Sequence, residues 1–211
     1  MDTAIIFDCE FLTRPGAPSR FWCGPHDPDP VIAQIGAVRL ALADDFAITD
    51  TFRIHVHPPG RFGAPQSIDP LFTKLTGITP DILATEGQPL ASALAEFAAF
   101  AGADRLWSWG KDELNLMAIS CYIAGIAPII PAHRFWNACH LLLAAGMPYD
   151  DLTRTRSNTL MSYYGLSDPD LVAHDAPDDA RSVAIVVQHL LRRGQLSPAE
   201  FRQMRPKADN P

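Results

Sequence analysis

The segment that decides the fold is TAIIFDCEF, which spans residues 3–11. Its β-branched and aromatic residues predict a buried strand, and this strand carries two acids, Asp8 and Glu10. Side chains alternate across a strand, so both acids point to the same face, about 6.6 Å apart along the chain. Burying two like charges is costly unless cations or hydrogen bonds compensate. The segment therefore predicts a functional pair of carboxylates, with a solvated strand end as the simpler alternative.

Two further strands are expected at 31–41 and 46–57, joined as a hairpin by the turn at Asp44 and Asp45. Apolar and polar residues alternate in the second of them, which is typical of a sheet with one solvated face. Residues 13–30, between the first two strands, are crowded with Pro and Gly and predict a long irregular loop. Long ordered loops are often functional, so this loop is a candidate for substrate contact.

Helical and extended patterns alternate over the rest of the chain. A run with helical spacing begins at Leu90, an apolar strand pattern follows it, and a strongly amphipathic helix begins at Pro177. The expected helices lie at 69–77, 90–101, 112–124, 138–146, 157–165 and from Pro177 onward, with strands at 103–109 and near 133–139. A strand hairpin followed by this alternation favours an α/β sandwich with a mixed central sheet.

Length and composition set the class of protein. With 211 residues and 47% hydrophobic content, the chain is long enough to bury a full core and short enough to be one domain. No run approaches the roughly 18 apolar residues of a membrane helix, and the start MDTAIIFDCE lacks the basic residues of a secretory signal. We therefore expect a soluble, cytoplasmic protein with no membrane partner. The polar end PKADNP is expected to fray.

Cysteine usage and net charge narrow the chemistry. The four cysteines form no CxxC pair, and Cys23 with His26 supplies only two of the four ligands that a tetrahedral zinc site requires. A net charge of −7 argues against broad electrostatic adhesion to phosphates. Divalent cations held by carboxylates would reverse the sign that a phosphate meets.

Three residues outside the first strand extend its acidic pair. Asp112 follows the apolar pattern LWSW and opens a helix, at a strand end where α/β proteins gather ligands, although helix capping is the alternative. Asp179 shares one face of the last helix with Val183 and Leu190, an unusual place for an acid without a partner. His174 lies five residues before it and, taken alone, is more typical of a surface histidine.

Four acids and one histidine fit phosphoryl transfer. Four carboxylates can hold two hard cations about 4 Å apart, one activating water and the other stabilising the leaving oxygen of an in-line displacement. An oxygen-rich site suits Mg²⁺ or Mn²⁺ and is a poor choice for zinc or copper. A histidine can accept a proton near neutral pH, so His174 is suited to take one from the attacking water.

Three segments carry a family resemblance. FDCEF, SWGKDELNL and HDAPDDA resemble, in this order, the three motifs of the DEDDh (DnaQ-like) 3′-to-5′ exonucleases. VIAQIGAVRL and LTGIT fall where family members carry similar segments, so the resemblance covers about the first 190 residues. It implies an RNase H-like three-layer α/β/α sandwich, with an exonuclease domain at residues 1–195 and a C-terminal tail at 196–211.

The resemblance also implies the roles of the site residues. Two Mg²⁺ or Mn²⁺ ions would be bound by Asp8, Glu10, Asp112 and Asp179. His174 would be the general base. The Trp-Gly-x-Asp form of the second motif is closer to the Eri-type RNA exonucleases than to the proofreading subunits of DNA polymerases. This favours the 3′ ends of single-stranded RNA over those of DNA. Family members often form homodimers, so a homodimer is among the expected partners.

A weaker transfer concerns substrate contacts. By resemblance, the terminal nucleotide would be held by Phe11, Leu12, Leu75 and Thr76. Trp109 could stack a base, a contact worth roughly 1–3 kcal/mol. Aromatic residues in such positions more often belong to the core. The long loop at 13–30 and the acidic charge depart from a minimal family member and leave the choice of substrate open.

Three alternatives accompany this interpretation. Tyr164 and Asp168 form the Y-x3-D third motif of a tyrosine-using sister group, but Asp168 is followed by Pro169, whereas Asp179 continues into an amphipathic helix. A nucleic-acid or protein binding module that kept the fold and lost turnover is the alternative from another functional class. An RNase H-like endonuclease is disfavoured by the H-x4-D spacing that begins at His174.

Overall fold

Five strands form a mixed sheet: β1 (Thr3–Phe11), β2 (Ile32–Ala41), β3 (Ile48–His55), β4 (Leu106–Ser108) and β5 (Phe135–Asn137). The computed structural model describes residues 3–202, and the order of the strands in the sheet is β3-β2-β1-β4-β5. Neighbours are antiparallel from β3 to β1 and parallel from β1 to β5. The carboxyl ends of β1, β4 and β5 therefore meet at one edge of the sheet, where α/β proteins gather their ligands.

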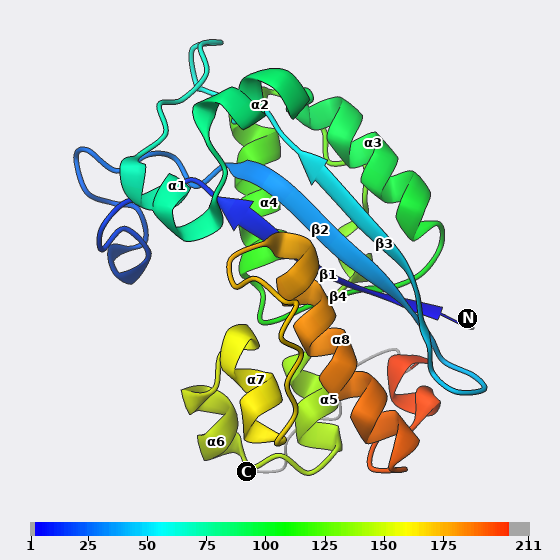
Figure 1. The fold of residues 1–211 in the computed structure, drawn as a ribbon. Helices are drawn as coiled ribbons and strands as arrows, with labels where there is room; N and C mark the ends of the chain where they lie inside the picture. The colour runs from blue at the N-terminus through cyan, green and yellow to red at the C-terminus, as the bar shows by residue number, and fades with distance from the viewer. Residues whose placement is uncertain (1–2, 203–211) are drawn as a thin grey trace.

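Helices cover both faces of this sheet. They are α1 (Pro70–Thr76), α2 (Pro80–Glu86), α3 (Leu90–Ala101), α4 (Asp112–Ala124), α5 (Cys139–Ala144), α6 (Tyr149–Arg154), α7 (Ser157–Tyr163) and α8 (Ala176–Arg192). In Figure 1, α8 crosses one face, while α3 and α4 lie behind the other. The three-layer α/β/α sandwich with a mixed central sheet agrees with the prediction.

The alternation along β1 divides the core in two. Ala4 and Ile6 pack with α8, whereas Ile5, Phe7 and Cys9 pack with α3 and α4. We call these the α8-side core and the α3/α4-side core. A third, smaller cluster joins the end of β1 to α1 and α2. The two acids of β1 continue the face that α8 covers.

Two observed helices, α2 and α6, are absent from the prediction, and each begins beside a proline. Pro80 occupies the first turn of α2, where Thr79 caps the helix by accepting a hydrogen bond from the Ile82 N–H at 3.1 Å. Pro148 precedes α6 at its N-cap. Proline has no N–H to lose in a first turn, so both positions tolerate it.

The end of the described chain packs onto the protein. Leu196 and Phe201, in the segment predicted as a tail, are buried in the α8-side core. PKADNP, at 206–211, lies outside the described residues. None of the helices within 3–202 combines the length and the apolar character needed to cross a membrane.

Candidate active site

The two acids of β1 lie side by side on the face that α8 covers. Ile6 belongs to the α8-side core, and Phe7 belongs to the opposite one, so Asp8 and Glu10 share a face as predicted. Glu10 is 9% exposed and Asp8 is partly buried. Both acids therefore sit between the sheet and the helix, where an uncompensated charge is costly.

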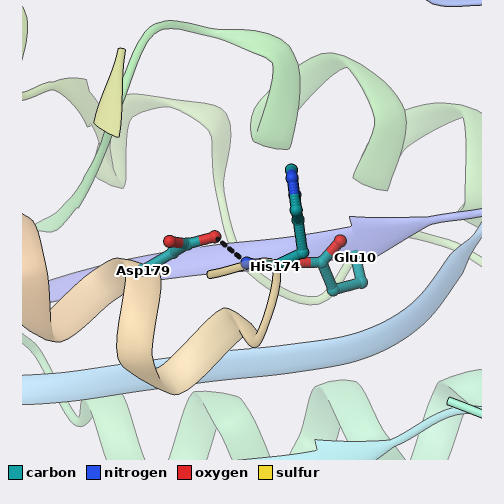
Figure 2. A group of neighbouring side chains, drawn as sticks. All are labelled: Glu10, His174 and Asp179. Atoms are coloured by element: carbon teal, nitrogen blue, oxygen red, sulfur yellow. Dashed lines mark hydrogen bonds between the residues drawn. The ribbon is translucent and has the colours of Figure 1, made fainter. Parts of the chain in front are cut away.

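The segment before α8 brings His174 and Asp179 to the same place. One ligand atom from each of Glu10, His174 and Asp179 lies within 4.8 Å of the others. Asp179 is 8% exposed, whereas His174 is exposed. The backbone N–H of His174 donates to Oδ2 of Asp179 at 3.1 Å, and Figure 2 shows the imidazole projecting from between the two carboxylates. An exposed base thus stands over two buried acids.

A close backbone contact sets the depth of α8. Gly36 pairs with Asp8 across the β1–β2 ladder, and a Cβ at Gly36 would lie 2.0 Å from the nitrogen of Pro177. Only glycine leaves room for the first turn of α8 at this distance. The contact brings that turn down onto β2, beside the acids of β1.

A polar network fixes the turn that carries His174. Gln34 of β2 is 1% exposed, accepts from the Ala176 N–H at 2.9 Å and donates to Asp175 at 3.1 Å. Arg53 of β3 pairs with both carboxylate oxygens of Asp175, with Nη2 at 2.5 Å from Oδ2. Bidentate pairs of this kind fix orientation as well as charge. Two strands therefore hold the residue that follows His174. His174 itself has φ 62°, a left-handed conformation that costs a non-glycine residue about 1–3 kcal/mol.

Helix α4 places its two acids differently from the prediction. Asp112 is exposed, and its Oδ1 accepts from the backbone N–H of Lys111 at 3.2 Å. The next residue, Glu113, is 5% exposed, and its Oε2 is buried with no hydrogen-bond partner in residues 3–202. The side chains of Ser108 and Asp8 lie within hydrogen-bond reach of Glu113. Glu113, which the sequence analysis missed, is the acid of α4 that faces Asp8.

A signal for Glu113 is present in the sequence. It begins the buried stripe of α4, whose members recur at helical spacing: Glu113, Leu116, Met117, Ser120 and Cys121. An acid in such a stripe is unusual unless it has a partner or a cation. The same argument identified Asp179 on α8.

Repulsion and burial raise the pKa values of this cluster. Burial, followed by the charge of Glu113, raises the pKa of Asp8 well above its ordinary value. Burial, followed by Asp179, raises the pKa of Glu10 to about 8, and burial, followed by Asp112, raises that of Glu113 to about 8. Burial also raises the pKa of Asp179. Carboxylates are the donors that hard divalent cations prefer, so the cluster and the unpartnered oxygen of Glu113 fit such ions.

Four of the predicted substrate contacts differ in how accessible their side chains are. Leu75 is 39% exposed on α1, and the hydroxyl of Thr76 is engaged at the end of the same helix, where it accepts from the Ile78 N–H at 3.1 Å. Phe11 is partly buried against the α3/α4-side core, and Trp109 is partly buried against the α8-side core. Leu75 is therefore the most accessible of the four.

Leu12 differs from the prediction. It is 1% exposed and lies in the third cluster, with Phe72 of α1 among its neighbours. Its side chain is thus part of the core and not a surface for a nucleotide. Its carbonyl accepts from Nε1 of Trp22 at 2.9 Å, which ties the loop at 13–30 to the end of β1.

The tyrosine-type third motif does not assemble. The carboxylate of Asp168 lies 3.7 Å from the guanidinium of Arg181, and Tyr164 packs against the α8-side core. Within residues 3–202, the ligand group that forms includes His174 instead.

Comparisons with known proteins support the fold. Protein-family models and curated proteins gave no match. Among solved structures, a 3′-exonuclease that recognises the 3′ end of a histone mRNA stem-loop has a TM-score of 0.73 and 18% identity, over 92% of this chain and 84% of that one. Cell-death related nuclease 4 (CRN-4) has a TM-score of 0.70 and 17% identity, over 93% and 66%.

A zinc-bound complex of E. coli ExoI with single-stranded DNA has a TM-score of 0.62 and 18% identity; it matches 95% of this chain, which spans 42% of that protein. The first and third of these neighbours are exonucleases and CRN-4 is a nuclease, in line with the resemblance of the three motifs. At such low identity the likeness shows the fold, and the RNase H-like prediction is confirmed.

Proposed function

We propose that this chain is a metal-dependent 3′-to-5′ exonuclease that hydrolyses phosphodiester bonds at the 3′ end of single-stranded nucleic acid, with RNA favoured over DNA. One observation carries the proposal: four inward-facing carboxylates and one histidine converge from three elements. They are Asp8 and Glu10 from β1, Glu113 from α4, and His174 and Asp179 from the start of α8. The fold shared with solved 3′-exonucleases supports the same activity.

The residues present fit two divalent cations, Mg²⁺ or Mn²⁺. Asp8, Glu10, Glu113 and Asp179 would hold them, with Glu113 in the place predicted for Asp112. When bound, the cations would activate water and neutralise the charge of the reacting phosphate. Bound cations also reverse the local sign of the site, which reconciles a chain of net charge −7 with a polyanionic substrate.

His174 is placed to accept a proton, and neighbouring residues hold it in position. His174 is exposed beside Glu10 and Asp179, so water can reach its ring and the ring can take the proton of the attacking water. Asp179 accepts a hydrogen bond from the backbone N–H of His174, which ties the position of the histidine to that of the acid. The pair of Asp175 with Arg53 restrains the following residue, which keeps the ring over the acids.

Two observations support the proposed choice of substrate. One neighbour recognises the 3′ end of an mRNA stem-loop, and another was solved with single-stranded DNA. The Trp109-Gly110 start of the second motif resembles RNA exonucleases, which supports RNA as the favoured sugar.

Digestion of labelled oligonucleotides tests the proposal. Linear single-stranded, 3′-recessed and circular RNA and DNA are incubated with Mg²⁺, Mn²⁺ or EDTA, with Asp8→Asn as the inactive control. We expect metal-dependent shortening from the 3′ end of the linear strands. Circular substrates should stay intact, and the Asp8→Asn variant should cut none of the substrates. Cleavage of circles would indicate an endonuclease. If no substrate is cut, the binding module with the same fold becomes the better interpretation.

A further inference from the structure

A cavity of about 350 Å³ lies beside the acid cluster, at the carboxyl ends of β4 and β5. It is lined by Ser108, Gly110, Lys111, Leu114, His133, Phe135, Trp136, Asn137 and His140. This volume is within the range of small-molecule sites, which is about 300–1,000 Å³. The cavity is therefore large enough for a group of the size of one nucleotide.

The lining of this cavity contains basic side chains, unlike the acid cluster. It includes the ammonium group of Lys111 and the imidazoles of His133 and His140, while the exposed carboxylate of Asp112 lies at its edge, against Gly110. Phe135 and Trp136 also belong to the lining, but their rings pack on opposite faces of β5, Phe135 against Phe7 and Trp136 against Trp107 and the Arg105 guanidinium. In a chain with net charge −7, a lysine and two histidines that line one cavity are groups to which a phosphate can bind.

Asn137 adds an oriented donor to this lining. Its Oδ1 accepts from the N–H of Gly110 at 3.1 Å and from the N–H of Cys139 at 2.8 Å. Both of these bonds use the oxygen, so the amide NH₂ is left as a donor toward a phosphate or a base. The same bonds hold the loop after β4 against the end of β5.

The cavity adjoins the acid cluster. Ser108 lines it, and the Ser108 side chain also lies within hydrogen-bond reach of Glu113, which faces Asp8. Gly110 and Lys111 line it immediately before the two acids of α4. A strand whose terminal phosphodiester lies over the acids would therefore meet this cavity with its next nucleotide.

We propose that this cavity binds the nucleotide on the 5′ side of the scissile phosphodiester, with its phosphate at Lys111 and His133 and its base toward the amide of Asn137. The inference rests on the proposed exonuclease function. It assigns the anion-binding work to a place separate from the acids, and it makes affinity depend on strand length.

Oligonucleotide binding tests the cavity directly. Fluorescence anisotropy with 5′-labelled strands of increasing length is measured with Mg²⁺ in the Asp8→Asn background, which prevents cleavage. The double variant Lys111→Met, His133→Gln removes two exposed basic side chains, and Arg193→Met, which removes one exposed charge at the C-cap of α8, is the control. We expect the double variant to bind strands about tenfold more weakly or worse, with a salt dependence reduced by about one to two units. The control should behave as the parent.

A small substrate separates this inference from the proposed function. The p-nitrophenyl ester of a nucleoside 5′-monophosphate has no upstream nucleotide, so the Lys111→Met, His133→Gln variant with Asp8 intact should hydrolyse it at the parental rate. Unchanged strand binding in the double variant overturns the cavity assignment. Equal loss on the ester and on strands also overturns it, because the two residues would then serve the acids. If the parent fails to hydrolyse either substrate, the proposed function fails, and strand binding still decides the role of the cavity.

Discussion

The first turns of α4 and α8 share a sequence pattern, and both flank β1. Each helix begins with two adjacent acids: Asp112 and Glu113 on α4, and Asp178 and Asp179 on α8. In each pair the second acid is buried, Glu113 at 5% and Asp179 at 8% exposure, and the first faces a backbone N–H instead. Neighbouring helix positions differ by about 100°, so only one of each pair can point at β1. Rotation of the helix about its axis therefore selects the ligand.

The sequence identifies the rotation of α8 and not that of α4. The apolar residues of α8 keep to one stripe, and Asp179 lies within it. In α4 apolar residues occur all around the helix, including the exposed Ile119 and Tyr122, so the pattern does not show which side is buried. A family motif shows which helix supplies an acid, whereas packing decides which residue it is.

The largest expected effect concerns the exposed base at the α8 end. His174→Ala should lower kcat by about 10²- to 10⁴-fold, because the attacking water loses its proton acceptor. Metal affinity, measured by calorimetry, should stay close to that of the parent. The matched control is His26→Ala, an exposed histidine in the loop at 13–30. A His174 variant with the parental rate would mean that the α8 end contributes only its acid.

The next effect compares the two acids of α4. Glu113→Gln should lower the rate by about 10²- to 10³-fold, since loss of a metal ligand removes several kcal/mol and each 1.36 kcal/mol is a factor of ten. Asp112→Asn should stay within a few-fold of the parent, because position 112 is exposed and either side chain has an oxygen that can accept from the Lys111 N–H. Metal affinity should fall for Glu113→Gln alone. The reverse ranking would return the ligand role to Asp112.

Much of the fold and three of the five site residues follow from local patterns. The alternation in β1 is a short-range signal, so it predicts both the strand and the shared face of Asp8 and Glu10. The stripe of α8 predicts the inward position of Asp179 in the same way. The contacts that hold this arrangement are long-range: Gln34 reaches Asp175, and Gly36 admits Pro177, across more than half of the chain. Periodicity carries no information about such pairs.

The two helix starts also differ in how they are held, and the third prediction concerns stability. Arg53→Met leaves Asp175 buried without its ion pair, so it should lower the free energy of unfolding by about 1–3 kcal/mol, less than for a fully buried pair because Arg53 is half exposed. Arg192→Met is the control, since its pair with Asp45 is exposed at both ends and should be worth under about 1 kcal/mol. Urea unfolding measures both. Equal effects would show that the network does not anchor α8.

The smallest expected effect is the change in stability per pH unit. Glu10 and Glu113 have pKa values raised from 4.5 to about 8, so between these values the folded chain binds more protons than the unfolded chain. Stability in EDTA should therefore fall as pH rises through this window, by at most about 1.36 kcal/mol per pH unit for each group. Mg²⁺ binds the deprotonated acids, so its stabilisation should grow over the same range.

Melting temperatures from pH 5 to 8.5, in EDTA and in Mg²⁺, measure this dependence. The slope of stability against pH in EDTA then compares the two acids of α4. Glu113→Gln removes one raised carboxyl, so its stability in EDTA should fall less steeply with pH than that of the parent. Asp112→Asn should keep the parental slope. A chain that becomes more stable in EDTA as pH rises would mean that the acids are compensated within the protein, and the case for a cation between α4 and β1 would then rest on activity alone.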